Sequence, residues 1–115
     1  VKSVAICSND VKNYPEDSFD KMIDFSKENN FSFPYLHDDS QEVAKNYNAV
    51  CTPDFFGYNN NMELQYRGRL RELKELKPIN VGDSDLFVAM KMIAETGNGP
   101  KSQIPSMGCN IKWIK

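Results

Sequence analysis

Two short runs of residues joined by three asparagines constrain the fold most. Phe55-Phe56-Gly57-Tyr58 is typical of a strand, and Asn59-Asn60-Asn61 is typical of a hairpin turn. In the segment that follows, apolar residues alternate with polar ones from Met62 to Arg67. The sequence therefore predicts an antiparallel hairpin whose second strand has one face toward water.

A strand and a helix are expected before this hairpin. Val4, Ala5 and Ile6 form a short apolar run, which predicts a strand buried on both faces. A helix is expected to begin near Pro15, because proline is tolerated in a first helical turn. Its apolar face would comprise Phe19, Met22, Ile23 and Ser26, with Phe25 beside them.

A short extended segment and a second helix should follow. Phe31, Phe33 and Tyr35 alternate with other residues, which predicts extended backbone. Asp39 is the expected N-cap of a helix over 40–48, because Glu42 follows it at the spacing of a capping box.

After the hairpin we expect a loop over 71–82, with a helical turn at 72–76, and then a final helix. Asp83 would cap this helix and Gly97 would end it. Its buried face would comprise Leu86, Phe87, Met90, Ile93 and Ala94. The segment 101–115 has no periodicity, although its apolar residues should pack: Ile104, Met107, Ile111, Trp113 and Ile114. The order β-α-β-α-β-β-α predicts the α/β class, with a mixed sheet flanked by helices.

Composition excludes several functions. The net charge is -2, so no broad basic field exists and nucleic-acid binding is not expected. No apolar run is long enough for a membrane span or a signal peptide, so no membrane partner is expected. The three cysteines are far apart and odd in number, which disfavours a disulfide framework and favours a cytoplasmic location. Without close Cys or His pairs, we expect no metal and no cofactor.

The tripeptide Cys51-Thr52-Pro53 stands immediately before the predicted hairpin. Proline is permitted at the first position of a strand, because it has no amide hydrogen to lose from the ladder. If the Thr52–Pro53 bond is cis, the Thr52 carbonyl and amide would turn outward, where an extended peptide or a thiol could meet them. The alternative is a proline that only begins a strand.

Several motifs occur in the order of a known family. They are Val-Ala-Ile-Cys-Ser-Asn-Asp (4–10), Tyr-Pro-Glu-Asp-Ser-Phe (14–19), Phe-Pro-Tyr-Leu (33–36), Gln-Glu-Val-Ala-Lys (41–45), Cys-Thr-Pro-Asp-Phe-Phe (51–56), Tyr-Arg-Gly-Arg-Leu (66–70), Ile-Pro-Ser-Met-Gly-Cys (104–109) and Ile-Lys-Trp (111–113). Together they resemble the peroxiredoxin-like branch of the thioredoxin superfamily, the relatives of alkyl hydroperoxide reductase and thiol-specific antioxidant.

The resemblance implies a thioredoxin-like fold that is entered midway. Residues 1–115 would form the C-terminal portion of a single thioredoxin-like domain, without its N-terminal strand–helix unit. The chain begins at Val1 inside an apolar run, which agrees with such a truncation. Thr52 and Pro53 would be the threonine and cis-proline of the substrate-facing loop.

The family's redox nucleophile would lie before this segment, often in a Cys-x-x-Cys-Pro setting. This sequence contains no Cys-x-x-Cys. We therefore expect a fragment of a thiol-disulfide oxidoreductase or peroxidase that is inactive alone, and whether this chain is itself an enzyme stays open. The substrate of the intact protein would be a thiol, a disulfide or a peroxide.

The three cysteines and two of the arginines could also take part in chemistry. Cys51 is the candidate redox thiol, as a resolving or modulating cysteine, or it is a small buried residue. Cys7 is expected to be structural. Cys109 is expected to be packed in the tail, and the alternative is a redox role. Arg67 and Arg69 are expected to be solvated charges at a strand edge, and the alternative is contact with a polar or anionic ligand.

Three hypotheses remain on the sequence alone. Besides the redox fragment, the chain could be a binding module that holds an extended peptide against Thr52 and Pro53, or a structural domain paired with another chain. His37, beside Asp38 and Asp39, is expected at the surface. Because the missing strand would leave a sheet edge exposed, we also expect a homo-oligomer formed through that edge.

Overall fold

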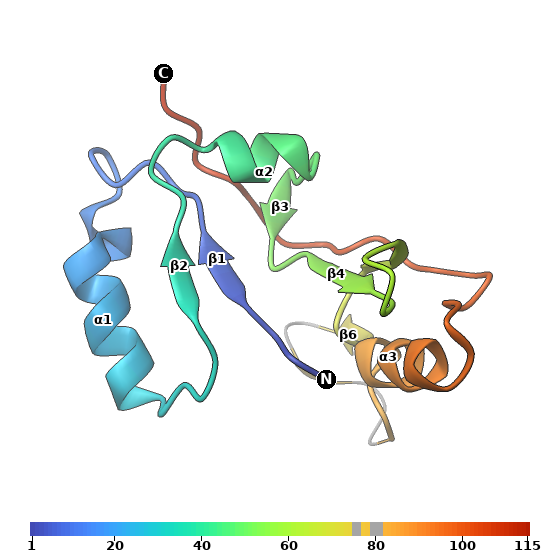
Figure 1. The fold of residues 1–115 in the computed structure, drawn as a ribbon. Helices are drawn as coiled ribbons and strands as arrows, with labels where there is room; N and C mark the ends of the chain where they lie inside the picture. The colour runs from blue at the N-terminus through green and yellow to red at the C-terminus, as the bar shows by residue number, and fades with distance from the viewer. Residues whose placement is uncertain (75–76, 79–81) are drawn as a thin grey trace. The chain divides into compact units, whose positions relative to one another are not determined.

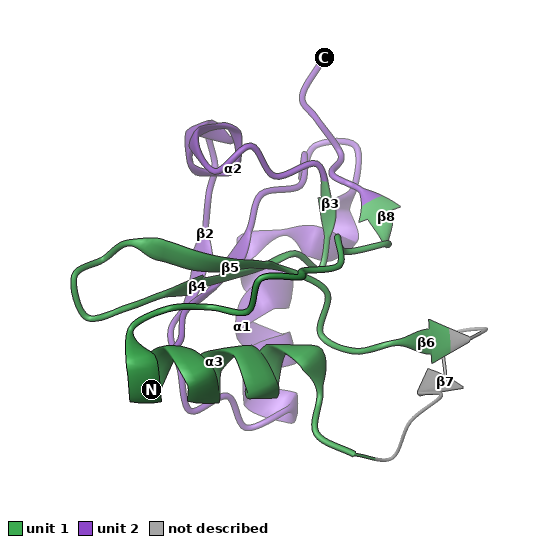
Figure 2. Cartoon of the chain, turned by 90° about the vertical axis from the view of Figure 1, so that its right-hand side faces the viewer, with its two compact units in different colours: residues 1, 51–109 green, residues 2–50, 110–115 purple. Residues whose placement is uncertain are grey.

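The computed structural model describes residues 1–74, 77–78 and 82–115. The chain divides into two units (Figure 2): unit 1 comprises Val1 and residues 51–109, and unit 2 comprises residues 2–50 and 110–115. Figure 1 shows the elements, which in chain order are β1 (Ala5–Cys7), a 3-10 turn (Pro15–Asp17), α1 (Phe19–Glu28), β2 (Tyr35–His37), α2 (Glu42–Asn46), β3 (Cys51–Thr52), β4 (Phe55–Tyr58), β5 (Leu64–Gly68), β6 (Leu73–Lys74), β7 (Lys77–Pro78), α3 (Asp85–Thr96) and β8 (Cys109–Asn110). Helices and small sheets are both present, which confirms the α/β class. The described strands form four two-stranded sheets, so the expectation of one mixed sheet flanked by helices was wrong.

Unit 2 contains a parallel pair, β1 and β2, in which Ile6 lies opposite Leu36. The predicted strand at 4–7 is confirmed over Ala5–Cys7, but burial on both faces was wrong. Ile6 is 41% exposed and Val4 is 55% exposed. The pair therefore has one uncovered face.

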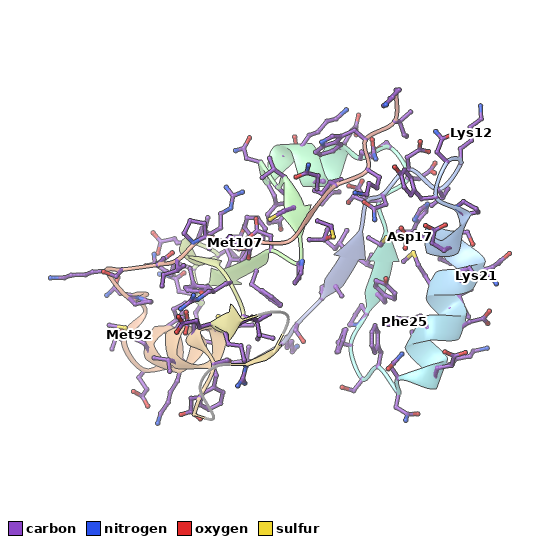
Figure 3. All side chains as sticks on the ribbon, turned by 180° about the vertical axis from the view of Figure 1, so that it is seen from behind. Lys12, Asp17, Lys21, Phe25, Met92 and Met107 are labelled. Carbon is purple, nitrogen blue, oxygen red and sulfur yellow. The ribbon has the colours of Figure 1, made fainter. Side chains whose placement is uncertain are left out.

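Aromatic residues pack at one end of α1 and β2. The ring centroids of Phe31 and Phe33 are 4.6 Å apart in a stacked arrangement, and Phe25 meets Phe31 edge-on at 5.6 Å. Figure 3 labels Phe25 on α1. Regular strand pairing begins only at Tyr35, so the alternating segment contributes ring packing before it contributes a strand.

The two helices of unit 2 begin differently. Ser18 caps α1 as its side chain accepts a hydrogen bond from the Lys21 amide. Asp39 does not cap α2, so that prediction was wrong. The carboxylate of Asp38 instead accepts from the amides of Val43 at 3.3 Å and Ala44 at 2.9 Å. The N-cap position itself is occupied by Gln41, in the left-handed region at φ 65°.

Unit 1 contains the predicted antiparallel hairpin, β4 and β5, and helix α3 packs against it. The core consists of Tyr66, Ala89 and Ile93, with Phe55, Leu86 and Met90 packed around them. Gly57 permits this packing, since a Cβ there would lie 2.5 Å from the sulfur of Met90. Met62 was expected in the second strand, but it lies in the turn at φ 60° and is 77% exposed.

The ends of α3 and its buried face differ in part from expectation. Ser84, not Asp83, caps the helix by accepting a hydrogen bond from the Phe87 amide at 3.0 Å. Phe87 and Ala94 are exposed, whereas Ala89 is fully buried. The buried face of α3 therefore includes Ala89, which the periodicity did not indicate, and excludes Phe87 and Ala94. Gly97 ends the helix at φ 79°, as predicted.

The segment 71–82 contains a short antiparallel pair, β6 and β7, in which Leu73 lies opposite Pro78. The helical turn expected at 72–76 was therefore wrong at Leu73 and Lys74, and its positions 75–76 lie outside the described residues. None of the helices among the described residues combines the length and apolar character that a membrane span requires.

The C-terminal segment forms one strand that periodicity did not indicate. β8 pairs with β3, and the Ile111 amide donates to the Val50 carbonyl at 3.0 Å. Of the apolar residues expected to pack, Ile111 is buried and Trp113 is half-buried. The other three are exposed: Ile104, Met107 and Ile114. Met107, which is labelled in Figure 3, is 93% exposed.

Candidate functional site

The candidate site is the turn that joins β3 to β4 in unit 1. The Thr52–Pro53 peptide bond is cis, as the family resemblance implied. Both residues are exposed, so no side chain seals the turn. The next residue in the sequence, Asp54, has a side chain that is only 7% exposed. A ligand can therefore reach Thr52 and Pro53 from solvent.

The segment before β8 lies along the inner side of this turn. A Cβ at Gly108 would lie 2.1 Å from the Thr52 carbonyl oxygen, so only glycine permits this approach. Ser106 is anchored nearby, where its hydroxyl donates to the Gly68 carbonyl at 2.8 Å. The Thr52 carbonyl thus faces Gly108, which corrects the expectation that it turns outward. The exposed surface is instead made by the side chains of Thr52 and Pro53.

The Cys51 thiol points to the same segment. It donates to the Ser106 carbonyl with sulfur and oxygen 3.6 Å apart. Burial raises the pKa of this thiol, and the negative charge of Asp54 raises it further, while Arg67 and the Gly108 amide offset part of the increase. Because the thiolate is the reactive form, Cys51 is a poor nucleophile near neutral pH.

Of the other two cysteines, Cys7 belongs to unit 2, whereas Cys109 follows Gly108 and begins β8, the strand that pairs with β3. All three are free thiols; Cys7 is half-buried and Cys109 is exposed. In unit 2, burial raises the pKa of Tyr35, and interactions with Cys7 and Asp17 raise it further. The structural reading of Cys7 agrees with this packing against Tyr35. The exposure of Cys109 contradicts the expectation that it is packed.

Both arginines near the turn are ion-paired, so the expectation of solvated edge charges was wrong. Arg67 binds Asp54 with nitrogen and oxygen 3.2 Å apart, and its guanidinium lies 5.1 Å from the ring centroid of Phe56. Arg69 binds Asp85 at 2.6 Å and so joins β5 to the start of α3. These pairs stabilise the hairpin and supply no unpaired cation at the turn.

His37 in unit 2 is largely buried, contrary to its expected surface position. Its side chain is 15% exposed, and its Nε2 lies 3.5 Å from the carboxylate of Asp39. Its Nδ1 is buried and has no hydrogen-bond partner among the described residues. The adjacent Asp38 has its carboxylate bound by the Ser8 hydroxyl at 2.7 Å.

Two surface hollows among the described residues are lined by other residues than Cys51, Thr52 and Pro53. One, of about 330 Å³, adjoins β1 and β2 in unit 2, and the other, of about 300 Å³, adjoins α3 in unit 1. Across the described part of the chain, no group of His, Cys, Asp and Glu side chains is arranged to hold a metal ion.

Sequence reasoning missed two residues that shape the turn. Ser106 and Gly108 belong to the motif at 104–109, but no periodicity marks that segment. The available signal was the glycine directly before Cys109, since glycine often marks a close approach between backbones.

Comparison with known proteins gives structural relatives of unstated function. No family model matches the sequence, and no curated protein matches it. An uncharacterized conserved protein from Geobacillus kaustophilus is 43% identical, with a TM-score of 0.90 over 99% of this chain and 60% of its own. A hypothetical protein from Sinorhizobium meliloti 1021 is 40% identical, with a TM-score of 0.87 over 98% of this chain and 62% of its own. The present chain thus spans about three fifths of the length of these relatives.

Proposed function

We propose that this chain carries the substrate-facing side of a thiol-redox domain of the peroxiredoxin-like branch. The attacking cysteine would belong to a part of the polypeptide outside these 115 residues. The observation that carries the proposal is the exposed turn at Thr52 and Pro53, set directly after Cys51 and before β4. An exposed turn of this kind can meet a sulfur atom or an extended peptide.

A thioredoxin-like fold is part of this proposal. It is supported by the order of elements, with a parallel pair (β1 and β2), then an antiparallel hairpin (β4 and β5), and then α3. The strand–helix unit absent from this segment would supply the cysteine at a helix N-terminus. A cytoplasmic location is also proposed, and the three free thiols support it.

The chemistry of the intact domain follows from thiolate reactivity. A cysteine at a helix N-terminus has a lowered pKa, so its thiolate attacks the terminal oxygen of a peroxide. The S–O bond forms as the O–O bond breaks, and the departing alkoxide takes a proton to give an alcohol. The resulting sulfenic acid is reduced by a thiol, which releases water and forms a disulfide. With a disulfide substrate, the same thiolate would form a mixed disulfide and release a thiolate.

In this scheme Thr52 and Pro53 hold the substrate, and Cys51 does not attack it. The raised pKa of Cys51 and its bond to the Ser106 carbonyl keep that thiol protonated. Its role is to pack the base of the turn.

Peroxide consumption with a thiol reductant tests the proposal. The 115-residue chain is expected to consume peroxide no faster than a variant of the same chain in which all three cysteines are replaced by serine. The longer Geobacillus kaustophilus relative is expected to consume peroxide or to reduce a disulfide catalytically. Turnover by the 115-residue chain would contradict the missing nucleophile, and inactivity of the relative toward both substrates would contradict the redox function.

A second candidate function is a non-catalytic module that binds extended peptides. The exposed turn supports it, because Thr52 and Pro53 are accessible to an extended peptide whatever the reactivity of the adjacent thiol. Peptide capture by the 115-residue chain that is lost in Pro53→Ala and retained in Pro34→Ala would support this function. The peptide-binding function would be preferred over the thiol-redox function only if the longer relative also showed no thiol chemistry.

We propose that the isolated chain forms homo-oligomers through an exposed sheet edge. In the described residues β1 pairs only with β2, so its other edge presents backbone groups that no strand of the chain satisfies.

A further inference from the structure

Residues 99–104, which follow α3 in unit 1, lie along β5 and take the place of a further strand there. We call this segment the strap. The carboxamide of Gln103 donates to the Gln65 carbonyl at 2.7 Å and accepts from the Arg67 amide at 2.9 Å. The strap therefore satisfies backbone groups that the edge of a sheet otherwise presents to solvent.

Both ends of the strap are held by β5 and the residue that follows it. At the start, the Gly99 amide donates to the side chain of Gln65 at 3.2 Å, and a Cβ at Gly99 would collide with the Gln65 backbone. At the end, the Arg69 amide donates to the Ile104 carbonyl at 3.0 Å. Glycine permits so close an approach because it has no Cβ. A change in the length of the backbone at this point would displace the strap.

The residue before the strap is an exposed asparagine. Asn98 is the one asparagine in the sequence that a glycine follows. It lies beyond the left-handed Gly97 that ends α3, and its amide donates to the Thr96 hydroxyl at 3.1 Å. Its carboxamide nitrogen donates to the Thr96 carbonyl across 3.4 Å. The carboxamide of Asn98 is thus in contact with water, and no side chain on the next residue shields it.

We propose that the Asn98–Gly99 peptide is a deamidation site, at which the chain modifies itself. The Gly99 backbone nitrogen attacks the carboxamide carbon of Asn98 and forms a C–N bond. The Asn98 side-chain nitrogen leaves as ammonia and takes the proton of the Gly99 amide with it. Water then opens the resulting succinimide ring at one of its two carbonyls. One opening gives aspartate, and the other gives isoaspartate, in which the backbone runs through the side-chain carbon.

The contacts of Gly99 make this reaction slow and selective. The bond from the Gly99 amide to Gln65 must open before the nitrogen can attack. Exposed turns open locally at a small cost in free energy, so the attack does not require unfolding of unit 1. A side chain on the residue after an asparagine hinders the attack, and Gly99 has none.

Either product weakens the strap. Aspartate places a negative charge just beyond the C-terminus of α3, where the helix dipole is also negative and the last turn has no basic residue. Isoaspartate adds one carbon to the backbone directly before Gly99, which cannot move closer to Gln65. The edge of β5 then loses its cover, and the loss is irreversible. This inference uses no redox chemistry, so it can fail while the proposed function holds, and the reverse.

Ageing of the 115-residue chain in mildly alkaline buffer tests the site. Peptide mass spectrometry should show conversion of Asn98 at least about tenfold faster than that of Asn61, an exposed asparagine that precedes Met62. Enzymatic methylation detects the isoaspartate product. Conversion of Asn98 no faster than that of Asn61 would overturn the inference.

Amide hydrogen exchange tests the effect on the strap. The aged fraction carries an added negative charge and is isolated by ion exchange. In it, the Arg67 and Arg69 amides should exchange faster than in the fresh chain, because they lose their acceptors in the strap. Unchanged exchange of both amides in this fraction would also overturn the inference.

Two variants separate this site from general ageing. Asn98→Ser should keep the slow exchange of both amides after the same treatment, whereas Asn61→Ser should age as the wild-type chain does. Loss of protection in aged Asn98→Ser would contradict the assignment. Circular dichroism shows that the variants fold, and the comparison of Asn98 with Asn61 in the wild-type chain needs no variant.

Discussion

The carboxamide nitrogen of Gln41 lies 2.6 Å from the carbonyl oxygen of Ser8 and donates a hydrogen bond to it. The same nitrogen donates to the Lys112 carbonyl at 2.9 Å, and the Gln41 oxygen accepts from the Ile114 amide at 3.0 Å. Gln41 is only 1% exposed. One buried side chain therefore joins the end of β1 to the C-terminal segment of unit 2.

Replacing Gln41 with alanine should lower the free energy of unfolding by about 3 kcal/mol, because three backbone groups, one buried and two partly buried, lose their partner. Gln41→Gly should lose less, since glycine tolerates the positive φ at this position. Glu42→Gln, at the neighbouring exposed residue, should change stability by less than about 0.5 kcal/mol. Urea unfolding measures all three, and unchanged stability in Gln41→Ala would contradict this role.

The approach of Gly108 to Thr52 predicts a steric effect. A Cβ at Gly108 would meet a backbone carbonyl, which cannot rotate away as a side chain can. Gly108→Ala should therefore destabilise unit 1 by about 2 kcal/mol or more and shift the amide resonances of Cys51 and Thr52. Gly82→Ala is the control, because nothing lies within 4 Å of its added Cβ. Equal behaviour of the two variants in thermal unfolding and NMR would refute the close approach.

Cys51 and Cys109 should differ in their rates of alkylation. The pKa of Cys51 is raised first by burial and then by Asp54, so it should react more slowly near neutral pH than the exposed Cys109. Asp54→Asn removes one cause and should shift the rate profile of Cys51 to lower pH. Asp85→Asn breaks the other arginine pair and should leave that profile in place. If Cys51 reacted as fast as Cys109 at every pH, the raised pKa of the Cys51 thiol would be contradicted.

Stability should depend on pH through Asp38. Burial alone would raise the pKa of this carboxyl, but hydrogen bonds from Ala44, Ser8 and Val43, together with His37, lower it below its ordinary value of 3.8. A group with a lowered folded-state pKa contributes stability above its unfolded pKa and loses it as the pH falls through the folded value. The free energy of unfolding should thus fall when the pH drops from about 5 to about 2. This decrease should be smaller in Asp38→Asn, and a larger decrease in the variant would oppose the assignment.

The 115-residue chain on its own is expected to self-associate at micromolar concentration. Light scattering should report a mass above 13.2 kDa that rises with concentration. Ile6→Pro removes a backbone donor from β1 and should reduce association. Lys2→Pro, which lies before β1, is the control and should change association less. A folded wild-type chain that remains monomeric throughout would count against edge pairing.

Local patterns predicted the elements that depend on local physics. The hairpin at 55–67 follows from alternation and a turn of asparagines, and the end of α3 follows from Gly97. The side chain that accepts hydrogen bonds from the first amides of each helix is one position from the expected residue, Asp38 instead of Asp39 for α2 and Ser84 instead of Asp83 for α3. In each case two neighbouring residues can cap, and tertiary contacts choose between them.

The candidate site depended on contacts that periodicity does not contain. Thr52 and Pro53 were identified from a tripeptide, but the approach of Gly108 joins segments more than fifty residues apart in sequence. The burial of His37 and the ion pairs of Arg67 and Arg69 likewise arise from partners brought together by folding. A single sequence shows the residue types but not these pairings.

The central claim is that the turn at Thr52 and Pro53 is a surface for a thiol or disulfide substrate. Titration of the ¹⁵N-labelled chain with an extended peptide carrying one central cysteine, followed by backbone amide shifts, tests it most directly. We predict that the largest shifts occur at Thr52, Asp54 and Phe55, and that Pro53→Ala abolishes them. Shifts confined to the hollows beside β1 or α3, with the turn unaffected at saturation, would contradict the account.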